Sequence, residues 1–298
     1  MAVVVLLGAG ASFGSVGVNP YPPPLGNKLF PELVKRNGVA ASLPIHIKRA
    51  FEANFEDGMA KYYAYTNGDI MTFQRELAEY LANFHPTESN VYIELIKTLG
   101  CNRVIYSSLN YDLLLEISAS KLGYFTNYSS TYQKGGVRLL KLHGSSNFWP
   151  DIPTGMLRNV RISGSGIADI QAPIRPLNQA DTLYKCRVED SVAPAIAMFA
   201  VGKKVKISPD YVERQYDMWA EQVSKASRIF VVGVRVHEVD EHIWSLLGKA
   251  KGKVSYFGFD SDKPEFERWK ENHNKKNAYF FKSDFKDAVK MIGRMYKN

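Results

Sequence analysis

The sequence predicts an α/β protein, with a Rossmann-like parallel sheet flanked by helices and a helical insertion after the first strand. Three observations support this prediction. A β-branched run at residues 3–7 ends in a glycine-rich turn, as buried parallel strands often do. Strand-length apolar runs then alternate with helix-period segments, which favours parallel strands joined by right-handed crossovers. Polar and glycine residues cluster where these strands should end, which is where such sheets bind ligands.

The strands and helices follow one another along the chain. After residues 3–7, β-rich runs predict strands at 103–107, 137–142, 228–233, 253–258 and 278–281. Apolar residues at three- and four-residue spacing predict helices at about 26–36, 44–54, 69–84, 89–99, 112–120, 209–226, 240–250 and 285–296. The proline-rich stretch at 19–24 cannot be helical and should run extended.

The length suits one large domain or one domain with a sizeable insertion, and we expect a single folded unit spanning residues 1–298, with a helical insertion at about 20–100 and an irregular segment at about 150–208. Hydrophobic residues make up 45% of the chain, which excludes a wholly disordered protein. Cys101 and Cys186 are too few and too far apart for a disulfide framework or a four-cysteine zinc site. No apolar run approaches the length of a membrane span, so we expect a cytoplasmic protein without membrane association.

The net charge of +8 permits an anionic partner, but a solvated basic surface is the simpler explanation of so modest an excess. The basic residues occur in short, scattered clusters that are not interleaved with aromatic residues. Direct binding of nucleic acid is therefore not expected.

The first candidate site is the turn after the first strand. Gly8, Ala9 and Gly10 lack bulky side chains, so the backbone there can approach a pyrophosphate, and the amides up to Ser12 can donate to phosphate oxygens. A tight turn without any ligand is the alternative, because the third glycine of the dinucleotide fingerprint is displaced to Gly14.

Two further strand ends carry polar side chains. Asn110 can hold a ribose hydroxyl or a water with Asp112 orienting it, although Asn and Asp also cap helices. His143 follows the run at 137–142 beside a glycine, which suits general-base chemistry, although a lone histidine is often structural.

The C-terminal half adds candidates for the adenosine end of a nucleotide, with ordinary helix-terminal roles as the alternatives. They are Asp260 and the acidic pair Asp240-Glu241, which comes shortly after Gly233. His237 and His242 do not form a metal pair without other ligands, so no metal site is expected.

Taken together, these residues resemble the sirtuin superfamily, and in particular the sirtuin-like NAD-hydrolysing effectors of bacterial anti-phage defence. The matching motifs occur in order over nearly the whole chain: Gly8-Ala9-Gly10-Ala11-Ser12, Ser108-Leu109-Asn110-Tyr111-Asp112, His143-Gly144 and Gly233-Val234-Arg235. Three departures stand out. The four zinc-binding cysteines of protein-deacylating sirtuins are missing, Val234-Arg235 replaces the usual serine, and Pro22-Pro23-Pro24 replaces the usual Gly-Ile-Pro element.

The resemblance implies an NAD+ glycohydrolase that takes NAD+ as its substrate and releases ADP-ribose and nicotinamide. Asn110 would hold the nicotinamide ribose and the attacking water, and His143 would act as the base. Alternatives are an NAD-dependent protein deacylase, an ADP-ribosyl transferase, or a nucleotide-binding structural subunit of a defence complex. The resemblance also implies a homo-oligomer or a separately encoded partner such as a HerA-type ATPase.

Overall fold

The computed structural model describes residues 3–158, 170–197 and 207–297. Its main element is a seven-stranded sheet with the order β11-β10-β9-β1-β4-β6-β5, in which every recorded strand pair is parallel. The strands are β1 (Val3–Leu7), β4 (Val104–Ser108), β5 (Phe125–Asn127), β6 (Gly136–Lys141), β9 (Arg228–Val232), β10 (Lys253–Gly258) and β11 (Ala278–Lys282). This architecture confirms the predicted fold class.

The central strand β1 is apolar throughout because both faces of the sheet are covered. Val3, Val5 and Leu7 point into a hydrophobic core on one face, and Val4 and Leu6 point into a second core on the other. Alternate side chains of a strand lie on opposite faces, so one short apolar run supplies both cores.

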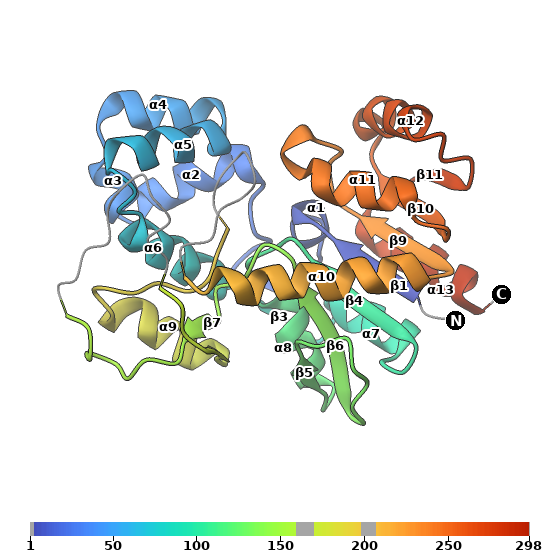
Figure 1. Ribbon diagram of the computed structural model, residues 1–298, viewed down its shortest axis with the longest axis horizontal. Helices are drawn as coiled ribbons and strands as arrows, with labels where there is room; N and C mark the ends of the chain where they lie inside the picture. The colour runs from blue at the N-terminus through green and yellow to red at the C-terminus, as the bar shows by residue number, and fades with distance from the viewer. Residues whose placement is uncertain (1–2, 159–169, 198–206, 298) are drawn as a thin grey trace.

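Helices cover the two faces of the sheet (Figure 1). The core that contains Val5 is completed by α7 (Val91–Leu99), α8 (Leu114–Lys121) and α13 (Phe285–Lys297). The core that contains Val4 is completed by α10 (Pro209–Lys225), α11 (Glu241–Lys249) and α12 (Lys263–Asn272). The short helix α1 (Ala9–Phe13) follows β1 directly.

A group of helices beside the sheet lies within the region predicted as a helical insertion, at the upper left of Figure 1. Its helices are α2 (Gly26–Lys35), α3 (Val39–Ser42), α4 (Ile45–Ala53), α5 (Phe55–Tyr65) and α6 (Met71–Ala82). The rings of Phe30 and Phe51 stack at 4.3 Å between centroids, and those of Phe51 and Phe73 at 5.4 Å. We refer to α2–α6 as the helical lobe.

The segment predicted as irregular contains two elements in its described part, and a third, β7, ends where it begins. They are β7 (Phe148–Pro150), β8 (Ile174–Pro176) and α9 (Gln179–Val188), of which α9 packs on α6. Residues 159–169 and 198–206 of that segment lie outside the described residues. Shorter elements complete the chain: β2 (Val18–Asn19), β3 (His85–Pro86), and the 3-10 turns Glu238–Asp240 and Asp260–Asp262. Among the described helices, none combines the length and apolar character that crossing a membrane requires.

Candidate active site

Four consecutive strands of the sheet, β9, β1, β4 and β6, bring their carboxyl ends to one edge. The chain leaves β1 toward β4 on one side and later returns to β9 on the other, which makes β1 and β9 the switch point of the sheet. Open α/β sheets bind ligands outside such a point. Gly8, Asn110, His143 and Gly233 each follow one of these four strands within two residues.

The glycine turn after β1 packs directly against the turn after β9. The amide of Gly8 donates to Val232 O at 3.0 Å, and the amide of Gly10 donates to Gly233 O at 2.9 Å. Gly233 has φ +63°, and a Cβ built there would lie 2.2 Å from the nitrogen of Ala11. These glycines are therefore required by the close approach of the two backbone segments.

The sequence predicts that the amides of this turn donate to phosphate oxygens, and the packing of the turn limits which of them can do so. The amides of Gly8 and Gly10, and that of Ala11, which donates to Gly8 O at 2.9 Å, are already paired with carbonyls of the protein. In this conformation these three amides are not available to bind a phosphate. Ala9 begins α1 and is exposed, so it lies on the solvent side of the turn.

Ser12, Asn110 and Asp112 form one buried hydrogen-bonded group, although they come from two different strand ends. Ser12 Oγ donates to Asp112 Oδ2 at 2.8 Å and accepts from Asn110 Nδ2 at 2.8 Å. Asn110 Nδ2 also donates to Gly8 O at 2.9 Å. Tyr92 Oη lies 2.8 Å from Ser12 Oγ, and because the serine proton is directed at Asp112, the tyrosine is the donor. The turn after β1 is thus tied to the loop after β4.

Asp112 also performs the helix-terminal role that the sequence left open. Its Oδ1 accepts from the amide of Leu114 at 3.1 Å, at the start of α8. One carboxylate oxygen of Asp112 therefore accepts a hydrogen bond from the start of α8, and the other accepts one from Ser12.

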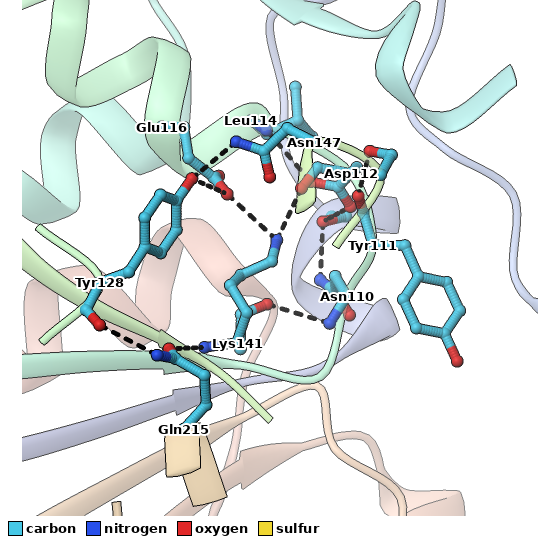
Figure 2. A network of polar contacts seen from close by, with 12 residues as sticks. Asn110, Tyr111, Asp112, Leu114, Glu116, Tyr128, Lys141, Asn147 and Gln215 are labelled. Atoms are coloured by element: carbon cyan, nitrogen blue, oxygen red, sulfur yellow. Dashed lines mark hydrogen bonds and ion pairs between the residues drawn. The ribbon is translucent and has the colours of Figure 1, made fainter. Parts of the chain in front are cut away.

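A buried ion pair lies beneath this group (Figure 2). Lys141, at the end of β6, is 1% exposed, and its Nζ donates to Asp112 O at 2.8 Å and lies 3.3 Å from Glu116 Oε1. Burial raises the pKa of Glu116, and the charge of Lys141 opposes that rise. Lys141 thus fixes the main chain of the Asn110–Asp112 loop from below.

Three more side chains surround the ion pair in Figure 2. Tyr128 Oη donates to Glu116 at 3.3 Å and accepts from Asn147 Nδ2 at 2.8 Å. Gln215, on α10, accepts from the amide of Lys141 at 3.3 Å and donates to Tyr128 O at 2.9 Å. The network links α8, α10 and the segment after β6.

His143 is held in place by main-chain hydrogen bonds to residues 195–197. Its carbonyl accepts from the amide of Ala197 at 2.8 Å, and the amide of Ser145 donates to Ala195 O at 3.0 Å. Gly144 between them has φ +79°, and a Cβ there would lie 2.0 Å from Ala195 O. The histidine is 3% exposed, so its ring is fixed rather than free in solvent.

The structure adds two residues beside His143 that the sequence did not connect with it. His143 Nε2 lies 3.4 Å from Asp240 Oδ1, and the rings of His143 and His242 are 5.9 Å apart. Asp240 and His242 lie at the start of α11, after β9, and of these two only Asp240 was predicted to face the adenosine end of a nucleotide. Only the three-dimensional packing of α11 reveals this neighbourhood, because no spacing rule links residues so far apart in the chain.

The remaining candidates lie apart from this group. Asp260 follows β10, which β9 separates from β1, and its exposed carboxylate pairs with Lys282 of β11. His237 is exposed, and its Nδ1 accepts from the amide of Val239 at 3.2 Å. The buried side chains of Ser12, Asn110, Asp112 and His143 therefore lie at the ends of β1, β4 and β6. Gly233 packs on the turn after β1, Ala9 is exposed on that turn, and Asp260 lies apart.

Comparison with known proteins adds little to what the structure itself shows. No protein family model matches the chain, and no curated protein sequence matches it. Among solved structures, one described as "Structural Basis for the Mechanism and Regulation of Sir2 Enzymes" is similar, with 17% sequence identity and a TM-score of 0.41. The similarity covers 100% of this chain and 94% of that one. At this level it says nothing about side chains, so the site is assigned from its own residues.

Proposed function

We propose that this chain is an NAD+ glycohydrolase. The observation that supports this function best is the juxtaposition, at the carboxyl edge of the sheet, of the Ser12–Asn110–Asp112 group with a buried histidine that follows β6, the strand next to β4. The motifs that resemble sirtuin-like NAD-hydrolysing effectors contribute all four of these residues. A nucleotide and a water would meet them at the edge where α/β sheets bind ligands.

The reaction needs no cofactor besides its substrate. The bond between nicotinamide and the anomeric carbon of ribose breaks, nicotinamide leaves with the bonding electrons, and the ribose passes through an oxocarbenium-like state. Water adds its oxygen to the anomeric carbon and loses one proton. The products are ADP-ribose, nicotinamide and that proton.

Asn110 is suited to bind the ribose through its side-chain oxygen. Both donated hydrogen bonds of its Nδ2 go to the protein, to Gly8 O and Ser12 Oγ. These bonds fix the orientation of the amide, so that Oδ1 is the atom left to accept from a ribose hydroxyl or a water.

His143 is suited to accept the proton from the water. Its carbonyl is anchored by Ala197, and the carboxylate of Asp240, 3.4 Å from Nε2, would stabilise the imidazolium that forms. General-base catalysis of this kind contributes about 10²- to 10⁴-fold in rate.

The first prediction tests these two roles. We expect purified protein to convert NAD+ to free ADP-ribose and nicotinamide, and His143→Ala and Asn110→Ala each to abolish measurable turnover, with a loss of about 10²-fold or more. Chromatography of the products after incubation provides the measurement. His85→Ala, which changes an exposed histidine of β3, is the matched control and should retain activity.

Circular dichroism and the unfolding midpoint verify that the inactive variants remain folded. Full consumption of NAD+ by either variant would exclude the assignment. Nicotinamide release that requires an acylated peptide or another acceptor would favour a deacylase or an ADP-ribosyl transferase. Unchanged NAD+ after prolonged incubation, alone or with partners, would favour a nucleotide-binding subunit.

We further propose that the activity depletes NAD+ in anti-phage defence, in a homo-oligomer or with a separately encoded partner such as a HerA-type ATPase. This proposal rests on the same motif resemblance. Cells that express the chain should lose NAD+ and restrict phage during infection, whereas cells that express His143→Ala should do neither. Restriction by the inactive variant would separate defence from NAD+ hydrolysis, and light scattering that shows a fully active monomer would contradict the assembly.

A further inference from the structure

Two histidines and one aspartate converge at the edge of the candidate active site. His143, Asp240 and His242 each present one ligand atom, and these three atoms lie within 4.8 Å of one another. In the described residues this is the group of histidine, cysteine and acidic side chains whose spacing suits a metal ion. His143 follows β6, whereas Asp240 and His242 begin α11, so the group exists only in the folded protein.

We propose that His143, Asp240 and His242 bind a divalent transition-metal ion such as zinc, and that the bound ion inhibits the reaction assigned to His143. The sequence alone led to the expectation of no metal, because His237 and His242 lacked further ligands. In the folded chain His143, which follows another strand, joins Asp240 and His242 in one group of ligand atoms. His237 stays outside that group.

The spacing of the ligand atoms fits a tetrahedral ion. Zinc binds imidazole nitrogen and carboxylate oxygen at about 2.0–2.2 Å, which places ligand atoms roughly 3.3–3.5 Å apart. His143 Nε2 and Asp240 Oδ1 are already 3.4 Å apart. His242 is exposed, so its side chain can close the remaining gap by rotation, while the buried His143 stays in place.

Exposure rises from His143 through Asp240 to His242, so the group opens toward solvent on the side of His242. His143 is 3% exposed, the side chain of Asp240 is 15% exposed, and His242 faces solvent. Tyr216 of α10 supports His242, since its hydroxyl donates to His242 O at 3.1 Å and its ring lies 5.5 Å from the imidazole. Three protein ligands with a fourth position open to water is an arrangement that zinc adopts in proteins.

The inhibitory effect follows from the chemistry of imidazole and rests on the proposed function. A neutral imidazole has one nitrogen that carries the proton and one that accepts. An ion bound at Nε2 of His143 forces the proton onto Nδ1, so neither nitrogen can accept the proton of a water. Asp240 would bind the ion as well and would no longer stabilise an imidazolium.

The second prediction concerns metal binding alone, so it does not depend on any activity. Competition between the full-length protein and a chromophoric zinc chelator should show one bound Zn²⁺ per chain. His242→Ala should weaken binding by more than the roughly 10- to 100-fold that loss of an outer-shell partner costs. His237→Ala, an exposed histidine of the same loop outside the group, is the matched control and should bind as the unchanged protein does.

No zinc binding, or equal affinity of the unchanged protein and His242→Ala, would overturn the metal site, whether or not the protein hydrolyses NAD+. If it does, Zn²⁺ should inhibit the unchanged protein and His237→Ala at the concentration that fills the site. The ratio of rates with and without Zn²⁺ should then approach one in His242→Ala. Stimulation by zinc, or equal inhibition of all three proteins, would overturn the inhibitory role.

Discussion

Lys141 holds the loop after β4 from within the core of the protein. It is a buried cation whose partners, Asp112 O and Glu116, lie at 2.8 Å and 3.3 Å. Loss of one partner from a buried ion pair leaves the other charge in a medium that solvates it poorly. Lys141 therefore holds the main chain at Asp112 in place, although it is not itself a candidate site residue.

The third prediction is that Lys141→Met lowers the free energy of unfolding by about 3–5 kcal/mol at neutral pH. Burial already raises the pKa of Glu116, so the native state binds the carboxyl proton of Glu116 more tightly than the unfolded state does. The contribution of Glu116 to stability therefore falls as pH rises from the unfolded-state pKa to the raised native pKa. Removal of Lys141 raises the pKa of Glu116 further. The loss of stability in Lys141→Met should therefore be largest at pH values above the raised pKa of Glu116, where the buried carboxylate is charged, and smaller at acidic pH.

Urea unfolding of the two proteins at acidic and at weakly alkaline pH measures this difference. Lys121→Met, which removes the partner of Glu88 in an exposed pair, is the control and should change stability little at either pH. Replacement of both Lys141 and Glu116 by apolar residues should restore much of the lost stability, because no buried charge then remains. An equal deficit at both pH values would contradict this account of Glu116.

Sequence reasoning at the residue scale predicted which candidate side chains lie close together, but it did not predict the contacts that each of them makes. The strand-end rule placed Ser12, Asn110 and Asp112 at one edge of the sheet, and these side chains are in contact. It could not place His242 beside His143, because that contact depends on how α11 packs against α10. Helix packing is decided by tertiary contacts that no local pattern encodes.

The elements predicted from sequence are those with a strong apolar pattern. The buried strands β1, β4 and β9 lie within one residue of their predicted ranges, because each reads as a continuous apolar run. Helices α9 and α12 were not predicted. α9 buries only Thr182 and Cys186, and α12 buries only Phe266 and Trp269, so neither shows an extended apolar stripe.

The fourth prediction concerns the contact between the turn after β1 and the turn after β9. Gly233→Ala should destabilise the protein by about 4 kcal/mol or more, because it combines a left-handed φ of +63° with a Cβ placed 2.2 Å from Ala11 N. Gly123→Ala is the matched control. It has φ +77° with no atom within 4 Å of the added Cβ, so it should lose only the conformational strain of about 1–2 kcal/mol.

Chemical denaturation of the two variants separates backbone strain from the close approach. Equal losses would mean that the two turns can move apart without cost, and Gly233 would then be required for its φ alone. A larger loss of stability in Gly233→Ala than in Gly123→Ala would support the close packing of the two turns as the reason that both turns contain glycine.

At the scale of the whole molecule, the helical lobe is connected to His143 through residues 190–197. Arg75 of α6 donates to Val192 O and Asp190 O, both at 3.0 Å, and Gln74 Nε2 donates to Ile196 O at 3.1 Å. The next amide, that of Ala197, donates to His143 O. The lobe therefore braces the segment that holds the candidate base, although no side chain of α2–α6 was proposed for the site.

The fifth prediction tests this connection. Arg75 is 6% exposed, and its guanidinium satisfies two carbonyls of the segment, so Arg75→Leu should lower the free energy of unfolding by about 2–4 kcal/mol. Arg36→Ala, which removes a partly exposed ion pair with Glu79, should cost at most about 1 kcal/mol. Amide hydrogen exchange provides the decisive measurement, because Arg75→Leu should accelerate exchange at Ala197 far more than Arg36→Ala does. Unchanged protection of that amide would mean that His143 is positioned by the sheet alone and that the helical lobe serves another purpose.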